Sequence, residues 1–485
     1  MTTTPAREFD VIVIGAGPVG ENVADRVVQG GLTAVIVEWE LVGGECSYWA
    51  CMPSKALLRA PMAVRAAQAL PGAAEAVTGS VDAQALFRYR NGVTSQWQDD
   101  GQLDWLDSAG IELVRGHGRI TAPREVTVTD ADGSVTLLSA RRAVVVATGT
   151  TATIPDITGM DEAEPWTSRD ATSAQRVPRS MIIIGGGVVA CEMATVYASL
   201  GSEVTLLSRS ALLKGLEPFV GEMVQESLEK LGVKVHTDAR PIWVQREETE
   251  EVSVTLSDET TIEAMELLVA TGRSPHTKDL GLDAIGLEPG AWLDVDDTMR
   301  VVDAGGHLFD DGWLYAVGDV NHRVLLTHQG KYQARAAGDV IVARAKGEPV
   351  QDAPWGAHVA TADHESVPQV VFTDPEVAAA GLTAAAAEKA GYRIRVVDYD
   401  IGHVAGATLV AQGYTGKARM VVDEDRQVVL GVTFVGAEVG ELIHSATVAI
   451  TGQVPLSRLW HAVPSYPTIS EVWLRLLETY GRQSA

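Results

Sequence analysis

The 485-residue chain is predicted to be a multidomain α/β protein with a C-terminal α+β region. Two glycine-rich turns, at Gly15 and at Gly185, each lie between an apolar β-branched run and a helical run, which is typical of parallel sheets covered by helices. From Pro368 onward the sequence changes to alternating strands without a further turn of that kind. Because the chain is too long for one hydrophobic core, we expect three or four domains.

The first unit opens with a strand predicted over Phe9–Ile14, followed by a G-x-G-x-x-G turn and a helix. Gly15 allows the tight turn, Gly17 lets the backbone approach a pyrophosphate, and Gly20 lets the helix pack on the strand. The next apolar run ends in Glu38, an acid placed to accept from ribose hydroxyls. These parts in this order predict a Rossmann-like dinucleotide-binding unit.

The second unit repeats this arrangement, with a strand predicted over Ser180–Ile184 and a glycine turn after it. Gly185 and Gly187 take the first two glycine positions, whereas Ala190 replaces the third glycine. A helix follows, and within it Cys191 is expected to be a small core residue. A second Rossmann-like domain is therefore predicted.

The strand that follows this second turn ends in Ser208 and Arg209 rather than in an acid. A carboxylate at that place would bind a free ribose 2′-hydroxyl and repel a 2′-phosphate. Ser208 and Arg209 can donate to the phosphate instead, and Lys214 is close in sequence. We therefore expect NADPH at this unit in preference to NADH.

Two of the three cysteines, Cys46 and Cys51, lie close together after the first nucleotide unit, and Lys55 follows on a helical run. This spacing can close a small disulfide loop. In a chain so poor in cysteine, such a pair is more typical of a reactive site than of a structural bridge. We expect the chemistry to take place here.

The composition restricts the partners and the compartment. The formal net charge of −26 argues against nucleic acid or an anionic membrane as a partner. The sequence contains neither a long apolar run nor a secretory leader pattern, and a chain with three cysteines fits a reducing compartment. We expect a cytoplasmic protein without a metal site.

Further turns follow apolar strands. Thr148-Gly149 closes the first unit, Thr271-Gly272-Arg273 closes the second, and Gly318-Asp319 follows the strand predicted over Leu314–Val317. An aspartate at such a turn can accept from the sugar-alcohol hydroxyls of a flavin side chain. Alternating residues between Gly118 and Arg142 predict antiparallel hairpins.

Together these motifs resemble the FAD-dependent pyridine nucleotide–disulfide oxidoreductases, which include glutathione reductase, dihydrolipoamide dehydrogenase and mercuric reductase. The resemblance joins Cys-x4-Cys-x-Pro-Ser-Lys to two nucleotide units, Gly-Asp and a C-terminal Pro-Thr-x-x-Glu, and it covers essentially the whole chain. It implies an FAD-binding domain in two segments, an NAD(P)H-binding domain and a C-terminal dimerisation domain. The corresponding ranges are 1–152 and 274–350 for FAD, 153–273 for NAD(P)H and 351–485 for the dimerisation domain.

The resemblance also implies the positions of the cofactor-binding residues. Those implied around FAD are Gly15, Gly17, Gly20, Glu38, Gly44, Lys55, Gly118, Gly149, Asp319 and Thr327. Those implied around NADPH are Gly185, Gly187, Ala190, Ser208, Arg209, Gly272 and Arg273.

For catalysis the resemblance implies that Lys55 pairs with Glu192 beside the flavin, where it stabilises developing negative charge. Electrons would pass from NADPH through the flavin to a Cys46–Cys51 disulfide. Cys51 would face the flavin, and Cys46 would attack the substrate disulfide as a thiolate.

The C-terminal motif departs from that of the disulfide reductases, because Tyr466 stands where they carry a catalytic histidine, although Glu471 is retained. A phenol can hydrogen-bond or donate a proton but is a poor base at neutral pH. Tyrosine at this position is similar to mercuric reductase and to the soluble transhydrogenase. His461 is a second candidate for the base, with a surface or structural role as the alternative.

We therefore expect a homodimeric, NADPH-dependent FAD oxidoreductase with a redox-active cysteine pair that reduces a disulfide or another small acceptor. Three alternatives stay open: electron transfer to a quinone, to a metal ion at the cysteines, or between pyridine nucleotides. A non-enzymatic alternative is a flavin-bound redox sensor.

Overall fold

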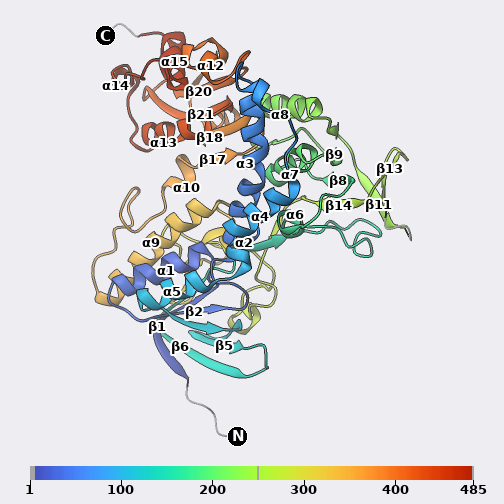
Figure 1. The fold of residues 1–485 in the computed structure, drawn as a ribbon. Coiled ribbons are helices and arrows are strands. Elements are labelled where there is room, and N and C mark those ends of the chain that lie inside the picture. Colours follow the sequence, from blue (N-terminus) through green and yellow to red (C-terminus); the bar gives the residue numbers. More distant parts are fainter. Residues whose placement is uncertain (1–5, 248–250, 483–485) are drawn as a thin grey trace. The chain divides into compact units, whose positions relative to one another are not determined.

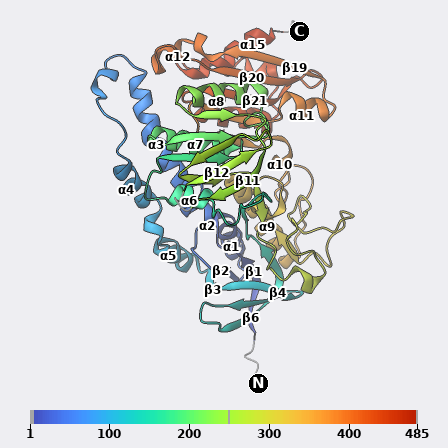
Figure 2. The ribbon, with the colours of Figure 1, turned by 90° about the vertical axis from the view of Figure 1, so that its right-hand side faces the viewer.

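A computed structural model describes residues 6–247 and 251–482 of the chain. The chain divides into two compact units, each built from three separate segments. The first unit comprises 1–53, 91–151 and 273–363, and the second comprises 54–90, 152–272 and 364–485. Figure 1 and Figure 2 show the course of the chain through these elements.

The first unit contains a seven-stranded sheet in which β3, β2, β1, β6, β5 and β4 are neighbours in that order and β16 also pairs with β6. Its strands are β1 (Arg7–Ile14), β2 (Ala34–Glu38), β3 (Glu112–Arg115), β4 (His117–Ala122), β5 (Glu125–Thr129), β6 (Val135–Val146) and β16 (Leu314–Ala316). Neighbours β3, β2, β1, β6 and β16 are parallel, whereas β4, β5 and the start of β6 form the predicted antiparallel hairpins. The carboxyl ends of β1, β2 and β6 align, with Ile14 opposite both Val37 and Val146.

Alternate side chains of these strands pack into two separate hydrophobic clusters, because successive residues of a strand point to opposite faces of the sheet. Val11 and Val13 face a cluster built with the helices α1 (Pro18–Gln29) and α9 (Thr327–Lys346). Ile12 and Ile14 face the opposite cluster. Helices α1 and α9 pack side by side, as Figure 1 also shows, and the unit is completed by α2 (Gly44–Tyr48) and α5 (Asp100–Ala109).

The second unit contains a parallel sheet with the strand order β10-β9-β8-β14, formed by β8 (Ser180–Ile184), β9 (Glu203–Leu207), β10 (Lys234–His236) and β14 (Glu266–Val269). An antiparallel sheet of β11 (Pro241–Arg246), β12 (Val252–Leu256) and β13 (Thr261–Ala264) belongs to the same unit. The helices of this part are α6 (Ser168–Ser173), α7 (Val188–Ser199) and α8 (Pro218–Lys230), together with α3 (Cys51–Gln68) and α4 (Ala83–Val93), which enter from the N-terminal segment.

The C-terminal part of this unit is a five-stranded antiparallel sheet in the order β17-β18-β21-β20-β19. It consists of β17 (Pro368–Val371), β18 (Glu376–Gly381), β19 (Ile394–Asp400), β20 (Lys417–Asp423) and β21 (Val428–Gly436). Its helices are α11 (Ala384–Lys389), α12 (Ala405–Val410), α13 (Ile443–Thr451), α14 (Leu456–Leu459) and α15 (Val472–Tyr480), and short α10 (Ala362–Glu365) precedes it. Two α/β nucleotide-type sheets and a C-terminal α+β domain confirm the predicted fold class.

Candidate functional site

The first glycine turn joins β1 to α1, and its three glycines meet three different steric demands. Gly15 has a φ of +105°, and a Cβ there would lie 2.4 Å from the carbonyl oxygen of Ala147. A Cβ on Gly20 would lie 1.9 Å from the carbonyl oxygen of Gly15, so only glycine lets the helix approach the turn. At Gly17 a Cβ would meet nothing within 4 Å, which leaves open space at the start of α1 where a pyrophosphate can lie.

Glu38 and Gly44 support this turn from the next elements. The buried Glu38 carboxylate at the end of β2 accepts a hydrogen bond from the N–H of Ala16 at 2.7 Å, and burial raises its pKa. A Cβ on Gly44 would lie 2.7 Å from the Cα of Gly17, so the start of α2 packs directly on the turn. Gly118 serves packing as well, because a Cβ there would lie 2.9 Å from a methyl group of Val37.

Cys46 in α2 and Cys51 at the start of α3 are present as partly buried reduced thiols. The hydrogen bond with Cys51 and burial raise the pKa of the Cys46 thiol well above its ordinary value. The Cys51 Sγ lies 3.4 Å from the Oγ1 of Thr327, the first residue of α9. The two sulfurs and this hydroxyl therefore form one cluster within the first unit.

Asp319, in the short 3₁₀ turn after β16, lies at the end of a chain of polar contacts. Its Oδ2 accepts from the hydroxyl of Thr150 at 3.0 Å, and that hydroxyl accepts from the Nε of Arg273 at 2.6 Å. Burial raises the pKa of Asp319. Arg273 also lies 3.5 Å from Glu45. The neighbouring Gly149 is open, with nothing within 4 Å of a Cβ built there.

The placement of Arg273 differs from the expectation that it lies with the NADPH-binding residues. It begins β15 (Arg273–Pro275), belongs to the first unit, and binds the hydroxyl and carbonyl oxygens of Thr150 in β7 (Thr150–Ala152). The Thr-Gly-Arg motif marks the crossing from one unit to the other, so sequence order alone did not decide to which unit the guanidinium belongs.

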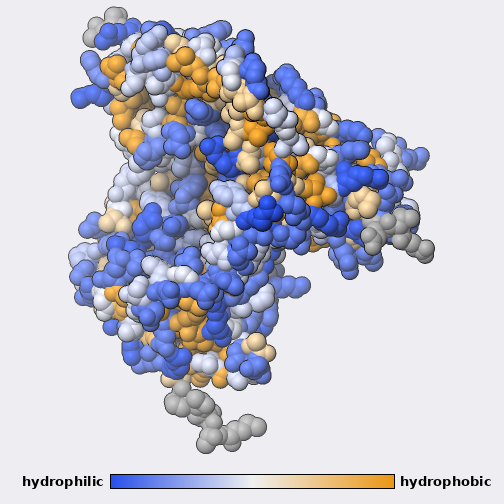
Figure 3. Space-filling model, viewed as in Figure 1, coloured by the Kyte–Doolittle hydropathy of each residue, from blue (hydrophilic) through white to orange (hydrophobic). Residues whose placement is uncertain are grey.

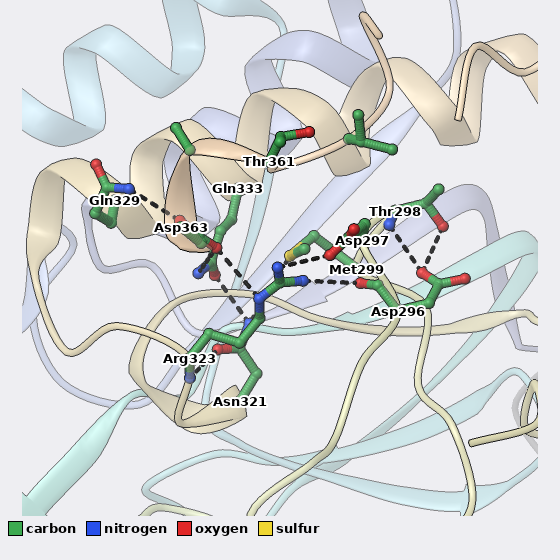
Figure 4. A network of polar contacts seen from close by, with 12 residues as sticks. Asp296, Asp297, Thr298, Met299, Asn321, Arg323, Gln329, Gln333, Thr361 and Asp363 are labelled. Atoms are coloured by element: carbon green, nitrogen blue, oxygen red, sulfur yellow. Dashed lines mark hydrogen bonds and ion pairs between the residues drawn. The ribbon is translucent and has the colours of Figure 1, made fainter. Parts of the chain in front are cut away.

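A buried polar network, shown in Figure 4, connects the Asp319 turn to α9. The Gln333 Oε1 accepts from the Gly318 N–H at 2.8 Å and from the Asn321 side chain at 2.9 Å. The amide nitrogens of Gln333 and Gln329 donate to the two oxygens of Asp363, at 2.8 and 2.9 Å. Sequence analysis missed this network because glutamines and an aspartate far apart in the chain form no motif.

The second glycine turn, between β8 and α7, has the same construction as the first. Gly185 has a φ of +140°, and a Cβ there would lie 2.2 Å from the carbonyl oxygen of Ala270. Gly187 and Gly272 are open, with nothing within 4 Å of an added Cβ. Ala190 is fully buried in α7, so a methyl group fits where the first unit requires glycine.

Ser208 and Arg209, at the end of β9, differ in burial. Ser208 is buried, and its hydroxyl donates to the carbonyl of Ser210 at 2.7 Å. A Cβ on Gly186 would lie 2.2 Å from the hydroxyl oxygen of Ser208. The Ser208 hydroxyl is thus bonded inside the loop, and its role as a phosphate donor stays a prediction. Arg209 and Lys214 are exposed. The N–H of Leu213 donates to Gly186, which ties their loop to the glycine turn.

Lys55 and Glu192 form an ion pair within the second unit. The Nζ of Lys55 in α3 lies 2.8 and 3.1 Å from the two carboxylate oxygens of Glu192 in α7. The Glu192 side chain is 3% exposed and that of Lys55 is 33% exposed. The N–H of Phe372 also donates to Glu192 at 3.0 Å, and the Lys55 Nζ lies 5.0 Å from the centre of the Phe372 ring. The adjacent Cys191 is fully buried, which confirms that it is a core residue.

The C-terminal residues differ strongly in exposure. The side chain of Tyr466 is 77% exposed, whereas Glu471 is buried and accepts from the N–H of Gly406 at 3.3 Å. His461 is exposed. Apolar residues also reach the surface of this domain, as Figure 3 shows, and they include Leu409, Val448 and Val463.

Within the described ranges 6–247 and 251–482, no helix is long and apolar enough to cross a membrane. Over the same residues, no group of three or more His, Cys, Asp or Glu side chains is arranged to hold a metal ion.

The sequence matches two family models over most of its length. Residues 9–341 match the pyridine nucleotide-disulphide oxidoreductase model, and residues 367–476 match the dimerisation domain of the same family. The chain belongs to the pyridine nucleotide-disulphide oxidoreductase family. The resemblance inferred from its motifs is therefore confirmed.

Named relatives agree with this assignment, and solved structures share the fold. The chain is 33% identical over 476 residues to a dihydrolipoyl dehydrogenase of Chlorobaculum tepidum, covering 96% of each chain. It is 29% identical to a mercuric reductase of Staphylococcus aureus, covering 96% of this chain and 81% of that protein. Its fold is similar to that of the HOCl-induced flavoprotein disulfide reductase RclA from Escherichia coli in a Cu(II) complex, with a TM-score of 0.82, 21% identity, and coverage of 97% and 99%. LpdA from Mycobacterium tuberculosis gives a TM-score of 0.79 at 24% identity, with coverage of 97% and 100%.

FAD is the cofactor of this family, and the first unit fits it. Gly17 and Gly149 leave open backbone, Glu38 stands at the end of β2, and the buried Asp319 stands at the turn after β16. The chain is thus an FAD-type oxidoreductase with a dimerisation domain.

Proposed function

We propose that this protein is an NADPH-dependent flavoprotein that passes electrons through the Cys46–Cys51 pair to a small acceptor, first of all a disulfide. The observation that carries the proposal is the hydrogen-bonded pair of thiols beside Thr327, in the unit whose open glycine turns suit FAD. Bound FAD would take a hydride from NADPH and pass two electrons to the Cys46–Cys51 disulfide.

The residues of the chain then carry out thiol–disulfide exchange. The Cys46 sulfur attacks the substrate disulfide, a mixed disulfide forms, and the first substrate thiol leaves with a proton. Cys51 attacks the Cys46 sulfur, which closes the internal disulfide again and releases the second thiol. Lys55, held in place by buried Glu192, supplies positive charge on α3, one helical turn after Cys51.

A second acceptor class is favoured by one observation. The Cys51 hydrogen bond and burial raise the pKa of Cys46, so the attack requires a base. Tyr466 stands where a histidine base is expected, and a phenol serves that role poorly at neutral pH. A quinone, a metal ion or a second pyridine nucleotide could take electrons without thiolate attack by Cys46.

The test is NADPH oxidation by the wild-type protein and a Cys46→Ser variant against a panel of disulfides, quinones and metal ions. Disulfide turnover that is lost in Cys46→Ser supports the thiol relay. Quinone turnover that persists in Cys46→Ser supports the second class. If no acceptor in the panel is reduced by either protein, the enzymatic proposal is wrong and a flavin-bound sensor is favoured.

The preference for NADPH rests on Arg209 and Lys214, which are exposed on a loop bound to the glycine turn. Arg209→Gln should raise the KM for NADPH at least about tenfold, since a charge-assisted hydrogen bond contributes about 1.5–3 kcal/mol. The KM for NADH should change little, and Lys278→Gln, at an exposed lysine of the other unit, is the matched control. Equal effects on both nucleotides would contradict the preference.

We further propose a cytoplasmic homodimer in which Tyr466 and Glu471 complete the partner's site. The matched dimerisation domain, the 77% exposure of Tyr466 and the apolar residues on the same domain support this arrangement. Light scattering on the purified protein measures the expected mass, twice the 51.5 kDa of one chain.

A further inference from the structure

The residue before the first cysteine organises the backbone between the two. Glu45 lies in α2, directly before the cysteine loop, residues 46–51, whose first and last residues are the two cysteines. The carbonyl oxygen of Glu45 accepts from the N–H groups of Trp49 and Ala50, at 2.8 and 2.7 Å. The cysteine loop is therefore folded back onto the backbone of Glu45.

The side chain of Glu45 ties this loop to a second contact. The Glu45 carboxylate lies 3.5 Å from the Arg273 guanidinium, and the two side chains are 28% and 23% exposed. The same guanidinium donates to the Oγ1 of Thr150 at 2.6 Å and to its carbonyl oxygen at 2.7 Å. Thr150 is buried, and its hydroxyl donates to Asp319 at 3.0 Å. Arg273 thus connects the cysteine loop to a buried position beside the Asp319 turn.

We propose that Glu45 is a positioning residue of the redox pair: its ion pair with Arg273 anchors the cysteine loop and makes the Cys46–Cys51 disulfide harder to reduce. The inference rests on the proposed thiol relay and adds to it a residue that sets how readily the pair accepts electrons. Glu45 acts through the backbone of the loop, because its carboxylate is bound to Arg273.

The stability of a disulfide depends on how closely the folded chain holds its two thiols. Thiols held close together have a high effective concentration, whereas a freer loop loses more conformational entropy when the bond closes. The middle of the loop is held separately, because the Trp97 Nε1 donates to the carbonyl of Tyr48 at 3.1 Å. Loss of the Glu45 contact should therefore loosen the start of the loop without unfolding it. Because the ion pair is partly exposed, we expect a change of about three- to fivefold in the equilibrium constant for reduction.

An effect of charge alone would give a different result. Removing the Glu45 carboxylate would favour negative charge on the neighbouring reduced sulfur, whereas removing the Arg273 guanidinium would disfavour it. Charge alone therefore predicts opposite shifts for the two changes, and loss of the anchor predicts the same shift for both.

The experiment compares the wild-type protein with Glu45→Gln, Arg273→Gln and the double variant, each as the full-length holoenzyme. Each protein is equilibrated anaerobically at one pH in mixtures of reduced and oxidised dithiothreitol. Reduction breaks the Cys46–Cys51 bond and forms two thiols, while dithiothreitol gives up two electrons and two protons and closes to its cyclic disulfide. Rapid alkylation followed by peptide mass spectrometry measures the reduced fraction of the pair.

Each single variant should raise the equilibrium constant for reduction about three- to fivefold, which corresponds to about 15–20 mV for a two-electron couple. The double variant should match Arg273→Gln, because that change alone already removes the ion pair. The matched control is Glu125→Gln, at an exposed glutamate that begins β5 of the same unit, and it should titrate as the wild type. Arg273→Lys, whose ammonium keeps the charge but cannot hold Thr150 and Glu45 together, replaces Arg273→Gln if the latter does not bind FAD, and it should shift in the same direction.

The inference is overturned if Glu45→Gln titrates as the wild type, if the two single changes shift the constant in opposite directions, or if their effects multiply in the double variant. If the wild-type pair forms no disulfide at any buffer ratio, the thiol relay itself is wrong and the inference is wrong with it. A wild-type pair that titrates while the variants do not shift refutes only the role of Glu45.

Discussion

Replacing Lys55 with methionine should destabilise the protein because it leaves a buried carboxylate without its counter-ion. The Glu192 side chain is 3% exposed, and the N–H of Phe372 still donates to its carboxylate once the ammonium at 2.8 Å is removed. Methionine preserves the unbranched stem, so the change in packing is small. The predicted effect is therefore electrostatic.

The magnitude follows from the exposure of the two partners. Removing one member of a fully buried ion pair costs about 3–5 kcal/mol. Because the Lys55 side chain is 33% exposed, water screens the pair and a cost of about 2–3 kcal/mol is expected. Glu192→Gln should cost less, about 1 kcal/mol, since the lysine left behind can be hydrated and the amide oxygen can still accept from Phe372.

The assay is urea denaturation of holoenzymes with equal FAD content, followed by tryptophan fluorescence. Lys55→Arg, which keeps the charge, is the matched control and should recover most of the lost stability. The reasoning is refuted if Glu192→Gln destabilises the protein as much as Lys55→Met, or if Lys55→Arg is no better than Lys55→Met.

Three further predictions concern other residues. Burial raises the pKa of Glu21 from 4.5 to about 7, so the folded state keeps a proton that the unfolded chain loses between these values. The free energy of unfolding should therefore fall as pH rises from 4.5 to 7 and then level off. In apo Glu21→Gln this fall should be smaller than in wild type by up to about 3 kcal/mol, as measured by urea denaturation at several pH values. An identical pH profile in the two proteins would contradict the prediction. Gln333→Ala leaves the Gly318 N–H and an Asp363 oxygen without their hydrogen bonds to Gln333, and it should weaken FAD binding about tenfold in a fluorescence titration. The control is Arg335→Ala, at an exposed residue of the same helix, which should not weaken FAD binding. Tyr466→His should raise NADPH-dependent disulfide turnover at least about tenfold over Tyr466→Phe, since imidazole accepts a proton at neutral pH; equal rates would exclude a base at this position.

Several residues of the site were predictable because their chemistry is encoded locally. Gly15, Gly17 and Gly20 occupy fixed places in one strand–turn–helix motif, so a short segment of sequence is enough to recognise it. The same holds for Cys46 and Cys51, which were predicted to be a reactive pair because they lie five positions apart in a short segment. The Lys55–Glu192 pair was predicted from the family resemblance, and the structure places the two side chains in contact.

Other residues could not be assigned from their position in the chain. Arg273 ends a recognisable motif, yet its guanidinium binds Thr150 because β15 pairs with β7 after the chain has returned to the first unit. The Ser208 hydroxyl donates to the carbonyl of Ser210, a contact that the place of the serine at the strand end does not reveal. Both outcomes depend on neighbours that only folding supplies.

The sequence by itself determined the two Rossmann-like units and the family and predicted a reactive cysteine pair, because each depends on short-range patterns of glycine, cysteine and apolar residues. Only the tertiary structure decided which hydroxyl contacts Cys51 and what holds that hydroxyl in place. Thr327 contacts Cys51, and Gln333 joins the Gly318 N–H to Asp363. These hydrogen bonds join distant segments, so they follow from the packing of α9 rather than from any local pattern.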